Sequence, residues 1–533
     1  MKQIVLPYAS TGYFSKAVSD YLREADEIKP FYEYSPKLPS FSNVIKKRSD
    51  FFTDREVLYE ALLKQHEIFK DEKSLKSVFQ NIESLKDGNT FTVTTAHQPN
   101  LFLGPLYLIY KIIGVINLAK KLRDHFTSHH FVPVYWMGSE DHDKDELNHI
   151  HLFGKKYSWD TDQEGAFGRM KTASLNNLIT EIGSILGNSE DGKACTNLLI
   201  QSYLEEETIA AATRKLLYHF FATDGLVVLD GDDASLKSLL VPVMEKDLFH
   251  QSSFPEVNTS NTYFSKHYAS LITPREINLF YLDSEIRQRI IKDNGRWQVL
   301  HTPISFSEDE LRELLHSHPE KFSPNVVLRP IYQELVLPNV AFIGGGAEVT
   351  YWMQLRSLFE IYNIPFPLIL LRNSVLWIDQ GNAQKMKKLN ISVEEMFKPP
   401  DLLIKMFVQS KVGELVSLKE EKLKLGNLME HTMNKGLQID GSLKGAIEAE
   451  KIKMQKSLEM IEDKLRKSAA KKEETSIQQI HSLKEKFFPQ NSLQERHDNF
   501  LSFYLRAGDG FFSELKSNLD PLNQQFSILI DEA

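Results

Sequence analysis

Residues 91–143 read FTVTTAHQPNLFLGPLYLIYKIIGVINLAKKLRDHFTSHHFVPVYWMGSEDHD. The runs FTVTT and FVPVYWM are short and β-rich, and between them lies an apolar helix that Pro105 opens and that reaches about Leu122. A polar loop follows each β-rich run. This order of strand, loop, helix, strand and loop is typical of a βαβ unit, whose two strands are parallel. The stretch therefore predicts an α/β fold.

The rest of the chain repeats this alternation of strands and helices. Further β-rich runs predict strands at Leu226–Leu229, Val326–Leu328, Ala341–Ile343 and Phe366–Leu371. An amphipathic helix is expected over Glu348–Tyr362, between the last two of these runs. Such alternation implies a mostly parallel sheet that helices cover on both faces. We predict this core over residues 91–399, with polar insertions at about 155–215 and 249–319 that serve as walls or lids.

The two ends of the chain differ from the core. Residues 1–90 are mainly helical in pattern and are predicted to be an N-terminal segment of the core. Over residues 400–488 the composition shifts to Lys, Glu, Leu and Met, with apolar residues at near-heptad spacing, and glycines interrupt it. Two long helices that fold back as an antiparallel coiled-coil hairpin are therefore expected, and residues 489–533 are predicted to be a helical segment that packs on the core. A lone helical pair buries little surface, so a homodimer through the coiled coil is expected.

Composition excludes several classes of function. The chain has 533 residues and a formal net charge of −9, which does not favour nucleic acid as the main partner. Cys195 is the single cysteine, so an intrachain disulfide, a Cys-based zinc site and a redox dithiol are excluded. No uninterrupted apolar stretch reaches the roughly 18 residues expected of a membrane span, and Met1–Tyr8 lacks the features of a secretory signal. We predict a cytoplasmic protein without a membrane or nucleic-acid partner.

The first polar loop, Thr94–Pro105, precedes a helix and carries His97, Gln98, Asn100 and Gly104. Free amides and the dipole at a helix N-terminus favour anions, so a phosphate or a carboxylate could bind there. The loop matches neither a Walker A motif nor a Gly-x-Gly-x-x-Gly fingerprint. An ordinary capped helix start is the alternative explanation.

The second polar loop, Gly138–His151, is the part of the chain densest in ionisable groups, and its side chains include Glu140, Asp141, His142 and Asp143. Such residues suit a metal ion, but their spacing matches no specific metal pattern and no metal is predicted. We favour binding of an ammonium or of hydroxyl groups, with one residue acting as general base. A solvated, acidic helix N-terminus is the alternative.

A third cluster contains Arg329 and the glycine run that precedes Glu348. Gly344 and Gly345 lie where a strand meets a helix, so a ligand could approach the backbone closely there. Arg329 could grip a carboxylate or a phosphate with its planar guanidinium group. A tight turn with a structural salt bridge is an equally good explanation of the spacing. Arg372, after the last predicted strand, is a weaker addition of the same kind.

These stretches together resemble the BshC family, cysteine ligases of bacillithiol biosynthesis. The resemblance rests on Thr94–Gln98 with Leu101–Tyr107, Val132–Trp136 with Glu140–Asp143 and Asn148-His149, Arg329-Pro330, Gly344-Gly345 with Glu348 and Tyr351-Trp352, and Gln494–Arg496. Their order and spacing agree along nearly the whole chain. Many family members carry Gly-Gln-Gln where this chain has Ala96-His97-Gln98.

The resemblance implies a Rossmann-like core with connecting insertions and a coiled coil that pairs subunits. It also implies a reaction, which joins the carboxyl group of cysteine to the amino group of glucosaminyl malate in the last step of bacillithiol biosynthesis. Forming an amide from a carboxylate requires activation, so ATP or ADP is expected as a ligand.

Our hypothesis assigns the candidate residues to one ligase pocket. The expected catalytic residues are His142, Asp143, Asp141 and His97. The expected binding residues are Gln98, Asn100, Gly104, Glu140, Asn148, Arg329, Gly344, Gly345, Glu348 and Tyr351. Two rival functions stay open, namely an adenylate-forming or nucleotidyltransferase-like enzyme that acts on another small acid, and a non-catalytic dimeric scaffold that binds nucleotide.

Overall fold

The computed structural model describes residues 1–69, 72–412 and 417–531, which form two compact units. The larger unit comprises Gln3–Leu376 and Ser492–Ile528, and the smaller one contains Trp377–Asn491. The predicted core boundary at residue 399 therefore differs from the division after Leu376. The expected C-terminal segment does fall largely within the larger unit, although its end is a strand, β15 (Gln525–Ile530).

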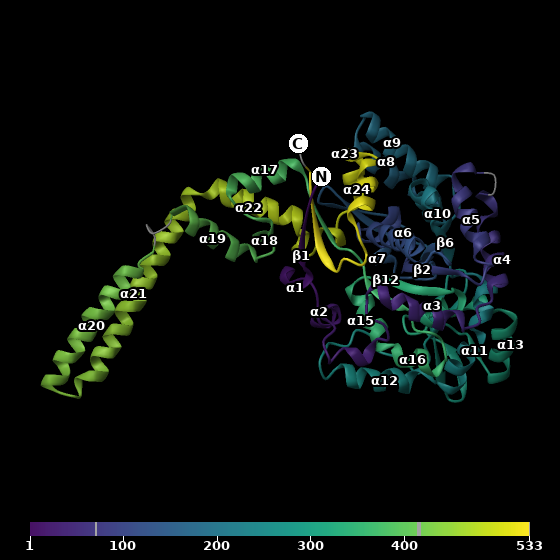
Figure 1. Cartoon of the computed structure of the whole chain (residues 1–533), viewed down its shortest axis with the longest axis horizontal. Coiled ribbons are helices and arrows are strands. Elements are labelled where there is room, and N and C mark those ends of the chain that lie inside the picture. The colour runs from purple at the N-terminus through teal and green to yellow at the C-terminus, as the bar shows by residue number, and fades with distance from the viewer. Residues whose placement is uncertain (70–71, 413–416, 532–533) are drawn as a thin grey trace. The chain divides into compact units, whose positions relative to one another are not determined.

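A five-stranded parallel sheet forms the centre of the larger unit (Figure 1). Its strands are β2 (Thr90–His97), β3 (His130–Met137), β6 (Val227–Asp230), β12 (Asn339–Gly344) and β13 (Leu368–Leu371). Their order across the sheet is β13, β12, β2, β3, β6, and every pair is parallel. The first strand of this sheet, β2, lies in its middle. The chain then adds β3 and β6 on one side, returns, and adds β12 and β13 on the other side. This is the doubly wound order of a Rossmann-like sheet, and the predicted fold class is confirmed.

The sheet is buried on both faces because helices cover it. Helix α6 (Tyr107–His125) connects β2 to β3 and lies on one face, while α15 (Gly346–Gln354) lies on the other (Figure 1). All residues of β2 but the last are buried, as expected for a central parallel strand. Gly114 faces Ile343 of β12, since a Cβ there would lie 3.4 Å from its Cδ1 atom.

Two local predictions are wrong. Val326–Leu328 is a turn, because the Asn325 side chain accepts a hydrogen bond from the Val327 amide at 2.8 Å and α14 (Arg329–Val336) begins directly afterwards. The strand of this region is β11 (Phe322–Pro324). Pro105 is also not the first helical residue. It forms a β-bridge with Asn499, and α6 starts at Tyr107.

The expected insertions have regular structure. An antiparallel sheet has the order β10, β9, β8, β7, β11, and its first four strands in sequence are β7 (Leu279–Leu282), β8 (Arg287–Asp293), β9 (Arg296–Val299) and β10 (Ser305–Phe306). Strands β4 (His149–Leu152) and β5 (Lys155–Ser158) pair antiparallel.

A three-stranded sheet is formed by segments outside the insertions. It has the order β1, β15, β14, with β1 at Lys2–Pro7 and β14 at Val375–Ile378. Strand β1 lies in a region that we predicted to be helical.

The remaining helices of the larger unit surround these sheets. They are α1 (Tyr8–Thr11), α2 (Lys16–Arg23), α3 (Phe41–Ser49), α4 (Arg55–His66), α5 (Lys76–Ser84), α7 (Lys144–Leu147), α8 (Asn176–Leu186), α9 (Glu190–Leu199), α10 (Ile209–Phe221), α11 (Ala234–His250), α12 (Ser253–Phe264), α13 (Glu308–Ser317), α16 (Arg356–Ile361), α23 (Leu501–Ala507) and α24 (Gly510–Asn518). Among the described residues, no helix combines the length and the apolar character that crossing a membrane demands.

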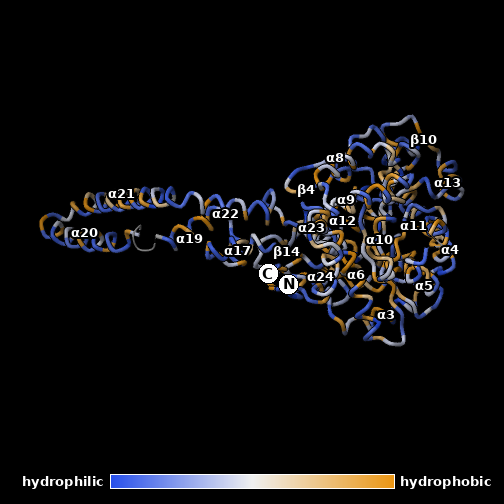
Figure 2. The backbone as a smooth tube through the Cα atoms, turned by 90° about the horizontal axis from the view of Figure 1, so that it is seen from above, coloured by the Kyte–Doolittle hydropathy of each residue, from blue (hydrophilic) through white to orange (hydrophobic). Residues whose placement is uncertain are grey.

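The smaller unit contains the predicted coiled-coil hairpin. Helices α20 (Lys419–Ile439) and α21 (Leu443–Lys472) pack side by side and are joined by a short turn (Figure 2). Gly436 allows this close approach, because a Cβ there would lie 2.5 Å from Cδ1 of Ile447. The coiled coil is therefore confirmed. The unit is completed by α17 (Gln380–Leu389), α18 (Val393–Met396), α19 (Pro400–Val412) and α22 (Glu474–Phe487).

Candidate active site

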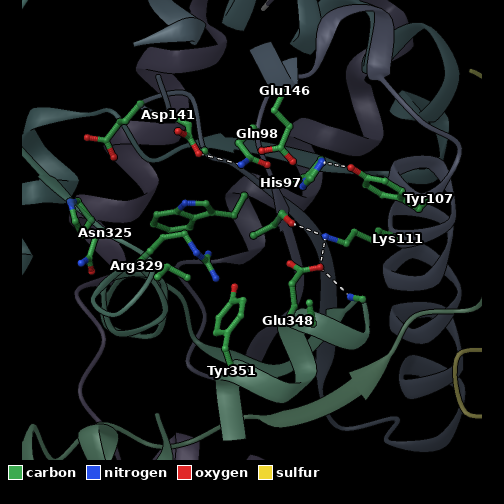
Figure 3. Close-up of a pocket in the computed structure, with 18 of the residues that line it drawn as sticks. His97, Gln98, Tyr107, Lys111, Asp141, Glu146, Asn325, Arg329, Glu348 and Tyr351 are labelled. Atoms are coloured by element: carbon green, nitrogen blue, oxygen red, sulfur yellow. Dashed lines mark hydrogen bonds and ion pairs between the residues drawn. The ribbon is translucent and has the colours of Figure 1, made fainter. Parts of the chain in front are cut away.

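A cavity of about 400 Å³ lies at the carboxyl ends of the parallel strands (Figure 3). Its wall includes residues that directly follow β2, β3, β12 and β13, among them Gln98, Gly138, Gly345 and Arg372. The chain reverses its winding direction between β2 and β12, so the loops after these two strands diverge and leave a crevice. Ligands of doubly wound sheets bind at such a crevice. The lining consists of Ala96, His97, Gln98, Tyr107, Lys111, Trp136, Gly138, Glu140, Asp141, Glu146, Arg287, Pro324, Asn325, Val326, Arg329, Tyr332, Gly345, Ala347, Glu348, Tyr351, Arg372 and Arg496.

His97 and Gln98, at the end of β2, point into the cavity (Figure 3). The Nε2 atom of His97 is 3.0 Å from the Tyr107 hydroxyl, and the Gln98 amide donates to Oδ2 of Asp141 at 2.9 Å. Burial of the ring, followed by the charge of Lys111, holds the pKa of His97 well below its usual value. His97 is therefore neutral at pH 7.

Asn100 and Gly104 lie outside the cavity lining, although we predicted them as binding residues. Both take part in a tight turn: Gly104 has φ +55°, and a Cβ there would lie 2.6 Å from the Asn100 side chain. The Asn499 amide group closes the turn by donating to the carbonyls of Phe102 (2.9 Å) and Gly104 (2.7 Å). The Leu106 amide, next to the start of α6, already donates to the Asp498 carbonyl at 2.9 Å. This part of the first loop has a structural role.

Glu140, which follows β3, is held by a buried network of charges that the sequence did not indicate. Its carboxylate lies 2.5 Å from Nζ of Lys237, a fully buried residue of α11. Lys237 also contacts Asp232 at 2.9 Å, and Asp232 accepts two hydrogen bonds from Arg169. Burial raises the pKa of Glu140 above its usual value, against the effect of Lys237. The network therefore fixes one carboxylate in the cavity wall.

Asp141 is an ionised, fully engaged carboxylate. It accepts hydrogen bonds from Gln98 and from the backbone amide of His142 (2.7 Å), and Arg287 lies nearby at 3.7 Å. Burial alone would raise its pKa, but the interactions with His142 and Arg287 outweigh burial and hold the pKa far below the usual value. Asp141 therefore stays charged throughout the physiological range.

The structure does not bring His142, Asp143 or Asn148 to the cavity wall. His142 is exposed, and its Nδ1 atom accepts a hydrogen bond from Arg287 at 2.8 Å. Asp143 is an exposed N-cap that accepts from the Glu146 amide at 3.3 Å, and Asn148 donates to the Trp159 carbonyl at 3.2 Å. Each has a structural partner.

The third cluster forms the opposite wall. Glu348 of α15 accepts a hydrogen bond from the Gly345 amide at 2.8 Å and forms an ion pair with Lys111, a buried residue of α6. Lys111 in turn donates to the Ala96 carbonyl at 3.0 Å, which ties this wall to the end of β2 (Figure 3). Gly344, the last residue of β12, does not line the cavity.

Arg329 has unused hydrogen-bonding capacity in this wall. Its Nη1 atom donates to Gln333 at 2.9 Å, whereas its buried Nη2 atom makes no hydrogen bond to the described residues. Tyr351 lies beside it in the cavity (Figure 3). A buried donor without a partner is costly, so this position favours an anionic ligand group.

Several lining residues were not among the predicted site residues, notably Lys111, Glu146, Arg287 and Arg496, whereas Arg372 was expected as a weaker addition to the third cluster. Lys111 lies within an apolar helical run, Arg287 comes from an expected insertion, and Arg496 follows the coiled coil by sequence. The Arg372 guanidinium pairs with the buried Glu495 carboxylate at 2.7 Å. A charge inside an apolar run was the available signal for Lys111, because a buried lysine needs a partner.

The cavity can accommodate phosphate groups. Its wall carries five basic side chains, Lys111, Arg287, Arg329, Arg372 and Arg496, together with the unpartnered donor of Arg329. It also carries four carboxylates, which suit an ammonium group. The residues therefore fit a nucleotide such as ATP in chemical type. Among the described residues, no group of three or more His, Cys, Asp and Glu side chains is placed to hold a metal ion.

Comparison with known proteins covers both units. Residues 1–373 match the family model "Bacillithiol biosynthesis BshC, N-terminal Rossmann-like domain", and residues 375–530 match the C-terminal coiled-coil domain of the same family. A protein of Flavobacterium psychrophilum named "Putative cysteine ligase BshC" is 40% identical over 98% of both chains. A protein of the same name from Flavobacterium johnsoniae is 40% identical over 98% of this chain and 99% of its own. The identity falls to 27% for the Staphylococcus haemolyticus protein of that name, over 96% of both chains. The chain therefore belongs to the bacillithiol biosynthesis BshC family.

Proposed function

We propose that this protein is a ligase that forms an amide bond between the carboxyl group of cysteine and the amino group of glucosaminyl malate, the last step of bacillithiol biosynthesis. The observation that carries the proposal is the division of charge in the cavity at the switch point of the sheet. Unpaired Arg329 Nη2 and the other basic side chains suit carboxylates and phosphates, while Glu140, Asp141 and Glu146 suit an ammonium. Both substrates carry groups of both kinds.

In this proposal the chain acts by binding and orienting its ligands. Lys111, Arg329, Arg372 and Arg496 hold phosphate or carboxylate groups, and Gly345 lets such a group approach the backbone. ATP, when bound, supplies the activation that a carboxylate needs before it can form an amide. Asp141, ionised and rigidly held, orients the ammonium of the acceptor. Rate then comes from positioning and from charge stabilisation in a preorganised site.

The expected homodimer is part of the proposal. Helices α20 and α21 pair with each other, yet several of their leucine, isoleucine and methionine side chains remain exposed. These side chains are Leu423, Leu428, Leu437, Ile439, Leu443, Ile452, Met454, Met460, Ile461 and Leu465. Exposed apolar residues spaced along a coiled coil are typical of a surface that a second copy covers.

The experiment that tests the function is an assay of the purified protein with cysteine, glucosaminyl malate and ATP, with the product identified by mass spectrometry. We expect a product that contains cysteine in amide linkage, and only when both substrates are present. Phosphate or pyrophosphate release with a different small acid, and without cysteine dependence, would instead favour an adenylate-forming enzyme of other specificity.

Substitution of Arg329 connects this assay to the cavity. Arg329→Met should raise KM by roughly 10- to 100-fold for the substrate whose carboxylate or phosphate Arg329 binds, because a charge-assisted hydrogen bond is lost. Arg329→Lys should raise KM less than Arg329→Met does. It should not reach the KM of the unaltered protein, since an ammonium cannot reproduce the paired hydrogen bonds of a planar guanidinium group. Arg289→Met, on β8 and not part of the cavity lining, is the matched control and should leave KM unchanged. An unchanged KM in both Arg329 variants would contradict this placement of the ligand.

A further inference from the structure

The carboxylates of the cavity differ in what they contact. Glu140 contacts Lys237, and Asp141 accepts from Gln98 and from two backbone amides. Glu348 accepts from the Gly345 amide and pairs with Lys111. Glu146 is the exception: within the described residues, its carboxyl oxygens make no hydrogen bond and no ion pair. The protein therefore provides this one acidic group in the cavity with no counterpart of its own.

The position of Glu146 is set by the backbone around it. It lies in α7, the short helix that follows the loop after β3, and its backbone amide is held by the Asp143 cap at 3.3 Å. Its side chain extends toward Gln98 and His97 and into the cavity (Figure 3). The carboxylate is thus fixed at its base and free at its tip, and it is accessible to a ligand that enters the cavity.

The electrostatic surroundings make this carboxylate a better proton acceptor than an ordinary glutamate. Partial burial, together with the negative charges of Asp143 and Asp141, raises the pKa of Glu146 above its usual value. A raised pKa brings a carboxylate closer to the range in which a general base works well. The other acidic groups are less suitable, since Asp141 has a strongly lowered pKa and Glu140 is bound to a buried lysine.

We propose that Glu146 is the general base that removes the proton from the acceptor amine before it attacks the activated carboxyl group. In this step an N–H bond of the substrate ammonium breaks, an O–H bond forms on the Glu146 carboxylate, and the electron pair stays on nitrogen. The nitrogen is then a nucleophile. The proposal rests on the proposed ligase function and deepens it. The sequence left the general base open among Glu140, Asp141, His142 and Asp143, and Glu146 is a further carboxylate that lines the cavity.

The first test is the pH dependence of Glu146→Gln. This variant keeps the size of the side chain but cannot accept the proton. We expect kcat for amide formation to fall by about 10²- to 10⁴-fold near pH 7, the usual contribution of a general base, with KM for the acceptor changed only a few-fold. The defect should shrink as the pH rises, because the free amine becomes abundant in solution. Asp145→Asn makes the same chemical change on the adjacent residue, which is exposed like Glu146 but does not line the cavity, and it should behave like the unaltered enzyme.

The second test is chemical rescue. Glu146→Ala opens space next to the reacting nitrogen, so added formate should raise kcat in a saturable manner, which a purely structural role of Glu146 would not produce. Formate should have no effect on the unaltered enzyme or on Asp145→Ala. A Glu146→Gln variant with normal kcat and a normal pH profile would overturn the assignment, and so would a Glu146→Ala variant that formate does not rescue. Both results require that the unaltered protein makes the amide. If the unaltered protein makes none, it is the proposed function that fails.

Discussion

His97 is a half-buried side chain at the end of β2, in the wall of the cavity. Its Nε2 atom faces the Tyr107 hydroxyl, and the ring is neutral because burial lowers its pKa. Tyr107 has a pKa raised to about 12, mainly by burial, and so keeps its proton. A tyrosine that donates to Nε2 leaves the proton of the ring on Nδ1, where it can serve as a hydrogen-bond donor. A glutamine amide offers the same kind of donor.

We therefore expect His97→Gln to keep activity within about tenfold, whereas His97→Leu should lose roughly 10- to 100-fold, because the latter leaves a ligand atom without its hydrogen bond. The measurement is kcat/KM for both variants between pH 5.5 and 8. A neutral His97 also predicts that His97→Gln leaves the pH profile around 6.5 unchanged. Equal losses in the two variants would show that His97 does more than donate a hydrogen bond.

Helix α11 carries a buried carboxylate that links it to the antiparallel sheet. Asp247 accepts hydrogen bonds from the Asn278 backbone amide at 2.5 Å and from its side chain at 3.2 Å, directly before β7. Burial raises the pKa of Asp247 to about 6, although these hydrogen bonds lower it. In the unfolded chain the same group titrates near 3.8. Between these two values the folded state holds a proton that the unfolded state has released.

The difference between the pKa of Asp247 in the folded and in the unfolded state predicts how the free energy of unfolding changes with pH. As the pH rises from about 4 to about 6, Asp247 should lower the free energy of unfolding by about 3 kcal/mol, given roughly 1.4 kcal/mol per pKa unit. Asp247→Asn does not titrate, so its stability relative to the unaltered protein should improve over that range and then level off. Urea unfolding from pH 4 to 8 measures the free energy of unfolding of both proteins. The other titrating groups are the same in both, so their effects cancel in the difference between the two free energies. A constant difference across this range would contradict the raised pKa.

The segment that follows the coiled coil in sequence is another element with an effect on the site. Asn499 closes the tight turn of the first loop, Glu495 pairs with Arg372, and Arg496 lines the cavity. Glu495 is completely buried and also accepts from the Val375 amide at 2.8 Å. The cavity of the candidate active site is thus completed by residues that come late in the chain. A truncation before this segment would leave buried charges unpaired, which is strongly destabilising.

At the level of the whole molecule, the exposed apolar side chains of α20 and α21 predict a dimer. Leu428 and Met454 are 59% and 44% exposed and line the same groove between these helices. Leu428→Glu combined with Met454→Glu should convert the protein to a monomer, because burying two carboxylates in an apolar interface is unfavourable. The control is Lys456→Glu, an exposed position on α21 outside this groove.

Sedimentation equilibrium or light scattering measures the mass of the protein in solution, which distinguishes a dimer from a monomer. We expect about 123 kDa for the unaltered protein, twice the chain mass of 61.4 kDa, and the chain mass for the double variant. Helix content by circular dichroism should stay unchanged, since the paired helices remain. A monomer in the unaltered protein, or a dimer that survives the double substitution, would contradict a dimer interface at these residues.

The sequence by itself determined the class of fold and the location of much of the site. Period and composition are local properties, so the βαβ unit at residues 91–143 and the helical hairpin could be predicted from them. The same applies to the loops after the strands, because the carboxyl ends of parallel strands meet at one edge. His97, Gln98, Glu140, Asp141, Arg329, Gly345, Glu348 and Tyr351 were all predicted and all line the cavity.

Only the tertiary structure decided which of these polar residues already have partners and which are free to meet a ligand. Lys111 with Glu348, Lys237 with Glu140, and Arg372 with Glu495 are pairs between distant parts of the chain, and no local pattern reveals them. The same long-range contacts moved Asn100 and His142 out of the candidate set and brought Glu146 in. The physical reason is that a charge is costly in the interior unless it is paired. Its role therefore depends on neighbours that folding supplies.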